Sequence, residues 1–165
     1  MRSGGQSQGD SGMRLKKREI SCSHELEDIL NLGTVCRLGL CRDNVPYVVP
    51  MCYGYSDGCL YFHSAGEGLK LEFIRSNRLA CFEIETDVSV KPAEEAFRWG
   101  MNYRSVIGYG NLEEIPGRED KLKAMNVLMK QYSGTDNWSI SDQRIDNVLI
   151  LKLRITEMTG KKSFK

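Results

Sequence analysis

The sequence lacks the motifs by which many enzymes are identified. It contains no G-x-S-x-G elbow, no Walker loop, no H-E-x-x-H and no G-x-G-x-x-G. No pair of carboxylates has a spacing that by itself indicates acid–base catalysis. If the protein is an enzyme, we therefore expect a bound cofactor to supply the difficult chemistry, while the protein supplies position and electrostatics.

Metal, nucleic-acid and membrane functions are also disfavoured. Six cysteines are present without a C-x-x-C pair, and only two histidines are available, so no metal site is expected. Lys and Arg number 23 against 22 Asp and Glu, which gives no broad attraction to nucleic acid or to anionic lipid. Because no secretory leader or long apolar run is found, we expect a cytoplasmic protein whose reduced cysteines pack in strands as small hydrophobes.

The 165 residues fit one domain with its own core. Residues 1–12 read MRSGGQSQGDSG, which has four glycines and almost no apolar content. This composition is typical of a disordered leader or a cloning remnant, with Met13 as an alternative start. Residues 13–165 are the predicted domain.

Short β-rich runs joined by tight turns dominate this domain. Strands are predicted at residues 35–40, 45–55, 59–63, 79–84, 97–107 (extending toward 113) and 148–155, and helices at 23–33, 66–76 and 116–134, with Ser23 as the cap of the first. Polar loops are expected at 85–95 and around Trp138. The early connections are too short for crossover helices, so the pattern favours an antiparallel barrel decorated by helices. Pro46 and Pro50 remove two ladder donors, so their strand lies at an edge or faces a ligand.

A candidate phosphate site lies where the third strand passes into the second helix, in YFHSAGEGLK at residues 61–70. The first N–H groups of a helix have no internal partners, and the helix dipole favours an anion there. Gly66 and Gly68 allow close approach, and Lys70 adds positive charge. An ordinary turn capped by Ser64 explains the same pattern equally well. His63 is either a structural residue at a strand end or a proton donor near neutral pH.

Five motifs, in order, carry a family resemblance: V-x-R-L-G-L (35–40), P-Y-V-V-P-M (46–51), L-Y-F-H-S-A-x-x-G-x-K (60–70), Y-x-S-V-x-x-x-G (103–110) and M-T-G-K (158–161). Their order and spacing resemble the 5-nitroimidazole-resistance family of the pyridoxamine 5′-phosphate oxidase-like FMN-binding split barrels. The resemblance spans residues 13–161.

This resemblance implies a mainly β fold, a six-stranded antiparallel Greek-key split barrel with a few peripheral helices. It also implies a homodimer with FMN at each of two sites between the subunits. By position, the resemblance assigns Val48, Val49, Pro50 and Met51 to the flavin ring, His63 and Ser64 to the ring and ribityl chain, Gly68 and Lys70 to the phosphate, and Ser105 to an approach from a neighbouring strand or the partner subunit.

The implied function is an FMN-dependent oxidoreductase that passes electrons from a reduced nucleotide to a small planar acceptor such as a nitroimidazole. His63 would position that acceptor or give it a proton. True pyridoxamine-phosphate oxidases have an Arg-Lys pair where this chain has Leu69-Lys70, so vitamin B6 oxidation is not expected. The alternatives are a non-catalytic flavin or haem sensing module, and a barrel that is empty or holds a deazaflavin. Five aromatic residues are candidates for stacking on flavin or acceptor: Tyr53, Tyr55, Trp99, Tyr103 and Trp138.

Overall fold

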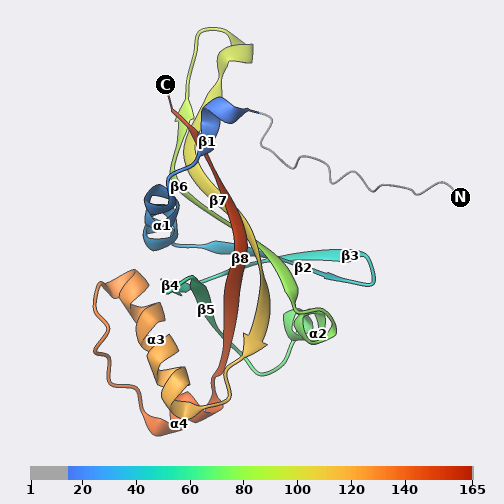
Figure 1. Ribbon diagram of the computed structural model, residues 1–165, viewed down its shortest axis with the longest axis vertical. Coiled ribbons are helices and arrows are strands. Elements are labelled where there is room, and N and C mark those ends of the chain that lie inside the picture. The colour runs from blue at the N-terminus through green and yellow to red at the C-terminus, as the bar shows by residue number, and fades with distance from the viewer. Residues whose placement is uncertain (1–14, 165) are drawn as a thin grey trace, which may run out of the picture.

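One antiparallel sheet forms the body of the protein. The computed structural model describes residues 15–164, so the predicted leader at 1–12 lies outside the described residues. Strands pair in the order β3-β2-β6-β7-β8-β5-β4, with β1 added to β8 (Figure 1). Their bounds are β1 Glu19–Ile20, β2 Cys36–Arg42, β3 Val45–Met51, β4 Gly54–Ser56, β5 Cys59–Ser64, β6 Leu79–Lys91, β7 Gly100–Glu114 and β8 Leu149–Ser163. Six long strands and two short ones confirm the predicted mainly β barrel-type fold.

Four α-helices lie around this sheet: α1 Ser23–Leu32, α2 Leu69–Ser76, α3 Arg118–Ser133 and α4 Asp142–Asn147. Two short 3₁₀ turns, η1 Lys16–Arg18 and η2 Ala96–Arg98, complete the described elements. Helix α1 buries Leu26, Ile29 and Leu30, as its apolar spacing predicts. The predicted cap at Ser23 is wrong, because the helix begins one residue earlier and Cys22 occupies the cap position without a side-chain hydrogen bond.

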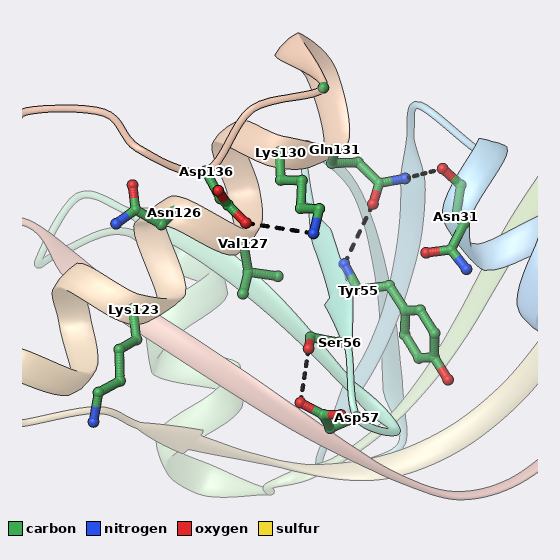
Figure 2. Close-up of a pocket in the computed structure, with 11 residues that line it drawn as sticks. Asn31, Tyr55, Ser56, Asp57, Lys123, Asn126, Val127, Lys130, Gln131 and Asp136 are labelled. Carbon is green, nitrogen blue, oxygen red and sulfur yellow. Dashed lines mark hydrogen bonds and ion pairs between the residues drawn. The ribbon is translucent and has the colours of Figure 1, made fainter.

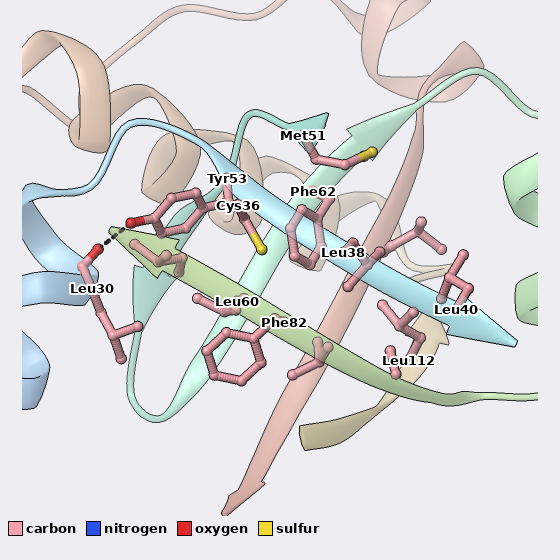
Figure 3. Packing of buried hydrophobic residues seen from close by; sticks show 14 of the residues in the cluster. Leu30, Cys36, Leu38, Leu40, Met51, Tyr53, Leu60, Phe62, Phe82 and Leu112 are labelled. Carbon is pink, nitrogen blue, oxygen red and sulfur yellow. Dashed lines mark hydrogen bonds between the residues drawn. The ribbon is translucent and has the colours of Figure 1, made fainter. Parts of the chain in front are cut away.

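The core consists mainly of inward-facing side chains of the strands, which pack against one another (Figure 3), with apolar residues of α1 and α2 added to them. Along β2, buried and outward-facing residues alternate with the period of two that a half-buried strand requires. Tyr53, in the connection between β3 and β4, is fully buried in this core, and its hydroxyl donates to the Leu30 carbonyl at 2.6 Å. The proposal that Tyr53 stacks on a flavin is therefore wrong, since no ligand can reach its ring.

The cysteines are free thiols, but their locations differ. Cys36 and Cys59 are buried as expected, and burial raises the pKa of Cys36, so that thiol stays neutral. Cys22 and Cys52 are exposed, because both lie in connections just outside a helix or strand.

Three predictions of secondary structure need correction. The predicted loop at 85–95 is mostly strand, because β6 continues to Lys91 and forms with β7 a two-stranded arm that projects from the body (Figure 1). The predicted strand at 45–55 is divided into β3 and β4. The polar segment after α3 contains α4, which sequence reasoning missed. Across residues 15–164, no helix has the length and apolar content needed to cross a bilayer.

Candidate cofactor site

Strand β3 offers a free edge. Among the described strands it pairs only with β2, in a register that sets Pro46 opposite Cys41 and Pro50 opposite Arg37. Of the two alternatives that the prolines left open, the edge strand is confirmed. An edge strand presents unpaired backbone N–H and C=O groups, which a ligand can use in place of a neighbouring strand.

The four candidate residues of β3 do not share one face. Val48 is 63% exposed and points outward with Pro50, whereas Val49 packs against the core and Met51 is buried. This alternation is the ordinary consequence of strand geometry. A ring lying along β3 would therefore meet the side chains of Val48 and Pro50 and the backbone of the intervening residue.

The turn before α2 depends on Gly68. Its backbone has φ 117° and ψ 166°, a region that is open essentially to glycine alone. The Gly68 carbonyl accepts the N–H of Leu71 at 2.9 Å, which closes the first turn of α2. The N–H groups of Leu69 and Lys70 have no backbone acceptor among the described residues, as expected at a helix start. A Cβ on Gly66 or Gly68 would have no atom within 4 Å, so this turn is open to a ligand.

Lys70 joins this turn to the edge strand. Its Nζ lies 3.5 Å from Sδ of Met51, at the end of β3, and its side chain is half-buried. No carboxylate of the described residues lies within 4.0 Å of this amine. The fold thus brings an ammonium group without an acidic partner, the free N–H groups of a helix start and an open strand edge into one place.

His63 and Ser64 point to opposite faces of β5. Ser64 is buried, and its hydroxyl donates to the adjacent Ala65 carbonyl at 2.9 Å. His63 is exposed and lines an open groove of about 520 Å³ between the end of β5 and helix α4. From α4, Arg144 and Asn147 face the same groove.

Sequence reasoning missed these two residues because it missed α4. A signal was present, since Ser141 is followed by an acid in the first turn, and Ile145 and Val148 are apolar at helical spacing. Ile145 is fully buried and fixes the helix against the body. The groove beside His63 is therefore built by the short helix.

Ser105 lies apart from the other candidates within one chain. It stands on β7 opposite Glu85 of β6 and Lys161 of β8, and strands β2 and β6 separate it from β3. Arg37, on the same outer face, is engaged by Glu83 at 2.9 Å and Glu85 at 2.8 Å. Burial raises the pKa of Glu83 even though the Arg37 guanidinium lowers it.

Another hollow of the described residues lies elsewhere and has a structural role. It measures about 730 Å³ and lies between α3, β4 and the end of α1 (Figure 2). Gln131 spans it, donating to the carbonyls of Leu30, Asn31 and Gly33 at 2.8 to 3.1 Å and accepting the N–H of Tyr55. The polar groups of Gln131 thus connect α1, α3 and β4. The stacking candidate Tyr55 lines this hollow, but none of the residues predicted to bind the cofactor or to act in catalysis does.

Known proteins resemble this chain over most of its length. A structure from Bacteroides thetaiotaomicron, solved as a candidate 5-nitroimidazole antibiotic resistance protein, is 30% identical, covers 87% of this chain and 85% of its own, and superposes with a TM-score of 0.76. A FAD-binding protein from Mesorhizobium loti is 26% identical and covers 89% of this chain and 98% of its own, with a TM-score of 0.66.

Sequence comparison gives the same result. Uncharacterized protein RA0666 of Rhizobium meliloti (strain 1021) is 30% identical over 123 residues, which are 72% of each chain. The family model described as pyridoxamine 5′-phosphate oxidase matches residues 23–162, nearly the whole described chain. The resemblance drawn from the five motifs is thereby confirmed, and the protein belongs to the pyridoxamine 5′-phosphate oxidase family.

Proposed function

We propose that the protein binds FMN at the junction of β3 and α2 and acts as a cytoplasmic oxidoreductase. The observation that carries the proposal is Lys70, whose amine has no acidic partner within residues 15–164 and lies beside both the start of α2 and Met51 at the strand edge. A phosphate fits this donor set, which combines one ammonium group with free backbone N–H groups. The FAD-binding relative from Mesorhizobium loti supports a flavin. One cation at the turn suits the single phosphate of FMN better than the two phosphates of FAD.

The residues present fit the parts of the cofactor. Lys70 and the first N–H groups of α2 would hold the phosphate, and the backbone of residues 48–51 would meet the polar edge of the ring. The outward side chains of Val48 and Pro50 would exclude water from that ring. When bound, the flavin supplies two-electron redox chemistry that the amino acids lack.

The chain itself must provide a proton donor. Two-electron reduction of a nitro group to a nitroso group consumes two protons and releases water, so a donor beside the acceptor is required. His63 is exposed on the groove next to the turn, and no other histidine lies there. We assign it the positioning of the acceptor and the delivery of a proton.

The first test is identification of the cofactor. Protein purified without added flavin is denatured, and the released compound is identified by mass and absorbance. We expect FMN at about one molecule per chain. Recovery of haem or a deazaflavin would replace the proposal with one of the alternatives, and colourless protein that takes up no added FMN would remove it.

His63→Ala is expected to leave the fold and flavin content unchanged while lowering acceptor turnover by roughly 100-fold, the lower end of the effect of a general acid. Turnover is measured as reduction of a nitro compound or quinone by NAD(P)H. His24→Ala is the matched control, because His24 lies on the exposed face of α1 beside Asp28. Full activity of His63→Ala would exclude the assigned role, and wild-type turnover no faster than free FMN would favour a binding module.

A second copy of the chain is the proposed partner. On the arm formed by β6 and β7, Val90 stands opposite Met101 on one face, while Ser89 and Asn102 form a hydrogen-bonded pair on the other. Val90 is 58% exposed, and Trp99 at the end of the arm is 56% exposed. A two-stranded ribbon with one uncovered apolar face is marginal in water, so this face favours a partner.

The outer face of the sheet offers a matching surface. One row across four strands sets Val48, Gly39, Cys81 and Tyr109 side by side, and both Val48 and Tyr109 are exposed. In a two-fold dimer, each copy can place its arm on the Tyr109 end of this row of the other copy and leave Val48 to the flavin, so both apolar surfaces are covered reciprocally. Such a dimer would bring Ser105, which stands on β7 at the base of the arm, toward the partner's flavin.

Val90→Glu is expected to convert the dimer to monomer, because it buries a charge in the apolar contact. Ser89→Glu is the control on the opposite face of the same arm. Mass from light scattering after gel filtration, measured at several concentrations, gives the result. A monomeric wild-type protein, or a Val90→Glu variant as dimeric as Ser89→Glu, would contradict the assignment of the arm.

A further inference from the structure

An apolar pocket of about 620 Å³ lies between α3, the connection that follows it and α4. Met125 and Met129 of α3 form one wall, and Trp138 and Ile140 of the connection form the other. The indole of Trp138 is held in place, because its Nε1–H donates to Ser133 Oγ at 3.1 Å, yet the side chain remains 48% exposed. The volume falls within the range of small-molecule sites.

The pocket opens toward the groove of His63. Arg144 and Val148 line both, so the apolar pocket and the groove share a boundary on α4. The two hollows are therefore neighbours, with Met129 in the one and His63 in the other.

Arg144 supplies charge at that boundary. The two acids of α4, Asp142 and Asp146, lie on Arg118 of α3. No carboxylate of the described residues lies within 4.0 Å of the Arg144 guanidinium. An exposed guanidinium at the mouth of an apolar pocket is complementary to a ligand that joins an apolar body to an anionic group.

We propose that this pocket binds a small aromatic molecule with one anionic substituent. The ring lies between the methionine sulfurs and the Trp138 indole, where sulfur–aromatic and stacking contacts favour a flat apolar body. A carboxylate or similar group pairs with Arg144 at the mouth.

The position of the pocket also suggests the role of its ligand. Because the pocket shares Arg144 with the groove of His63, a ligand held there reaches toward the proposed proton donor. The pocket is therefore the subsite for the electron acceptor. This role rests on the proposed function, whereas the binding of an anionic aromatic molecule does not. Accordingly, anionic aromatic acceptors are preferred over neutral ones.

The test uses the two tryptophans of the chain. In a Trp99→Phe background, Trp138 is the only indole and reports directly on the pocket. The full-length protein, with and without FMN, is titrated with 4-nitrobenzoate and with its neutral counterpart 4-nitrobenzamide. We expect saturable quenching by the carboxylate in both forms of the protein and weaker binding of the amide.

Arg144→Gln is expected to weaken 4-nitrobenzoate binding by roughly 10-fold or more, from loss of a charge-assisted contact, with little effect on the amide. Lys123→Gln is the control, since Lys123 is an exposed cation of α3 that does not line this pocket. Circular dichroism confirms that each variant is folded. Equal binding of acid and amide, or no effect of Arg144→Gln, would overturn the proposal.

Failure of this inference can be distinguished from failure of the proposed function. If the protein binds FMN but not 4-nitrobenzoate, the proposed cofactor stands and the proposed subsite is wrong. If the protein binds 4-nitrobenzoate but not FMN, the pocket stands as a binding site, but its proposed role in electron transfer is wrong. Loss of quenching on dimer formation would show instead that a second copy fills the pocket, which also overturns the inference.

Discussion

Replacement of Lys70 by methionine is expected to weaken FMN binding by roughly 10- to 100-fold, the range of a hydrogen bond to a charged group. Methionine keeps an unbranched apolar stem beside Met51 and removes only the ammonium group. The free N–H groups of α2 remain, so binding is weakened and not abolished. The dissociation constant is measured by the quenching of flavin fluorescence as FMN is added to cofactor-free protein.

Riboflavin gives this prediction its sharpest control. It has the same ring and ribityl chain as FMN but no phosphate, so Lys70→Met should leave its binding nearly unchanged. Arg75→Met removes a cation from the last turn of the same helix, where Arg75 pairs with Glu114, and should affect neither ligand. Equal losses for FMN and riboflavin would show that Lys70 does not contact the phosphate.

Local patterns in the sequence predicted much of the fold, because they describe interactions between near neighbours. The Arg42-Asp43-Asn44 turn is an example. Asp43 and Asn44 adopt φ values of 51° and 63°, which Asp and Asn tolerate better than most residues, and the resulting tight hairpin joins β2 to β3. The positions of α1 and α3 follow in the same way from apolar residues at helical spacing.

The sequence failed where tertiary pairing outweighed local composition. Charged residues suggested a loop at 85–95, but Ser89, Val90 and Lys91 within it continue the strand and pair with residues 100–102 of β7. A bulge between Thr86 and Ser89, with Asp87 at φ 58°, interrupts the ladder and conceals its continuation. Helix α4 was missed because six residues are too few for a clear helical period.

In the candidate site, too, local features could be predicted from the sequence and long-range contacts could not. The strand-to-helix turn and its lysine were visible in the residue order, since Gly68 and Lys70 are adjacent to the third strand. The contact of Lys70 with Met51 joins residues 19 positions apart and arises from the fold. Arg144 lines the groove of His63 only because the fold places α4 across from the end of β5, a long-range arrangement that no spacing in the chain encodes.

Gly54→Ala is expected to destabilise the protein by about 3 kcal/mol, at the upper end of ordinary overpacking. A Cβ at Gly54 would lie 2.7 Å from backbone atoms of Val127 and Leu128, so the whole of α3 must shift to admit it. For a chain of this size, the melting temperature should fall by roughly 10 °C, measured by circular dichroism without flavin. Gly66→Ala is the control, because its Cβ would meet no atom within 4 Å. If the two variants have the same melting temperature, then β4 and α3 do not pack so closely that only a glycine fits at position 54.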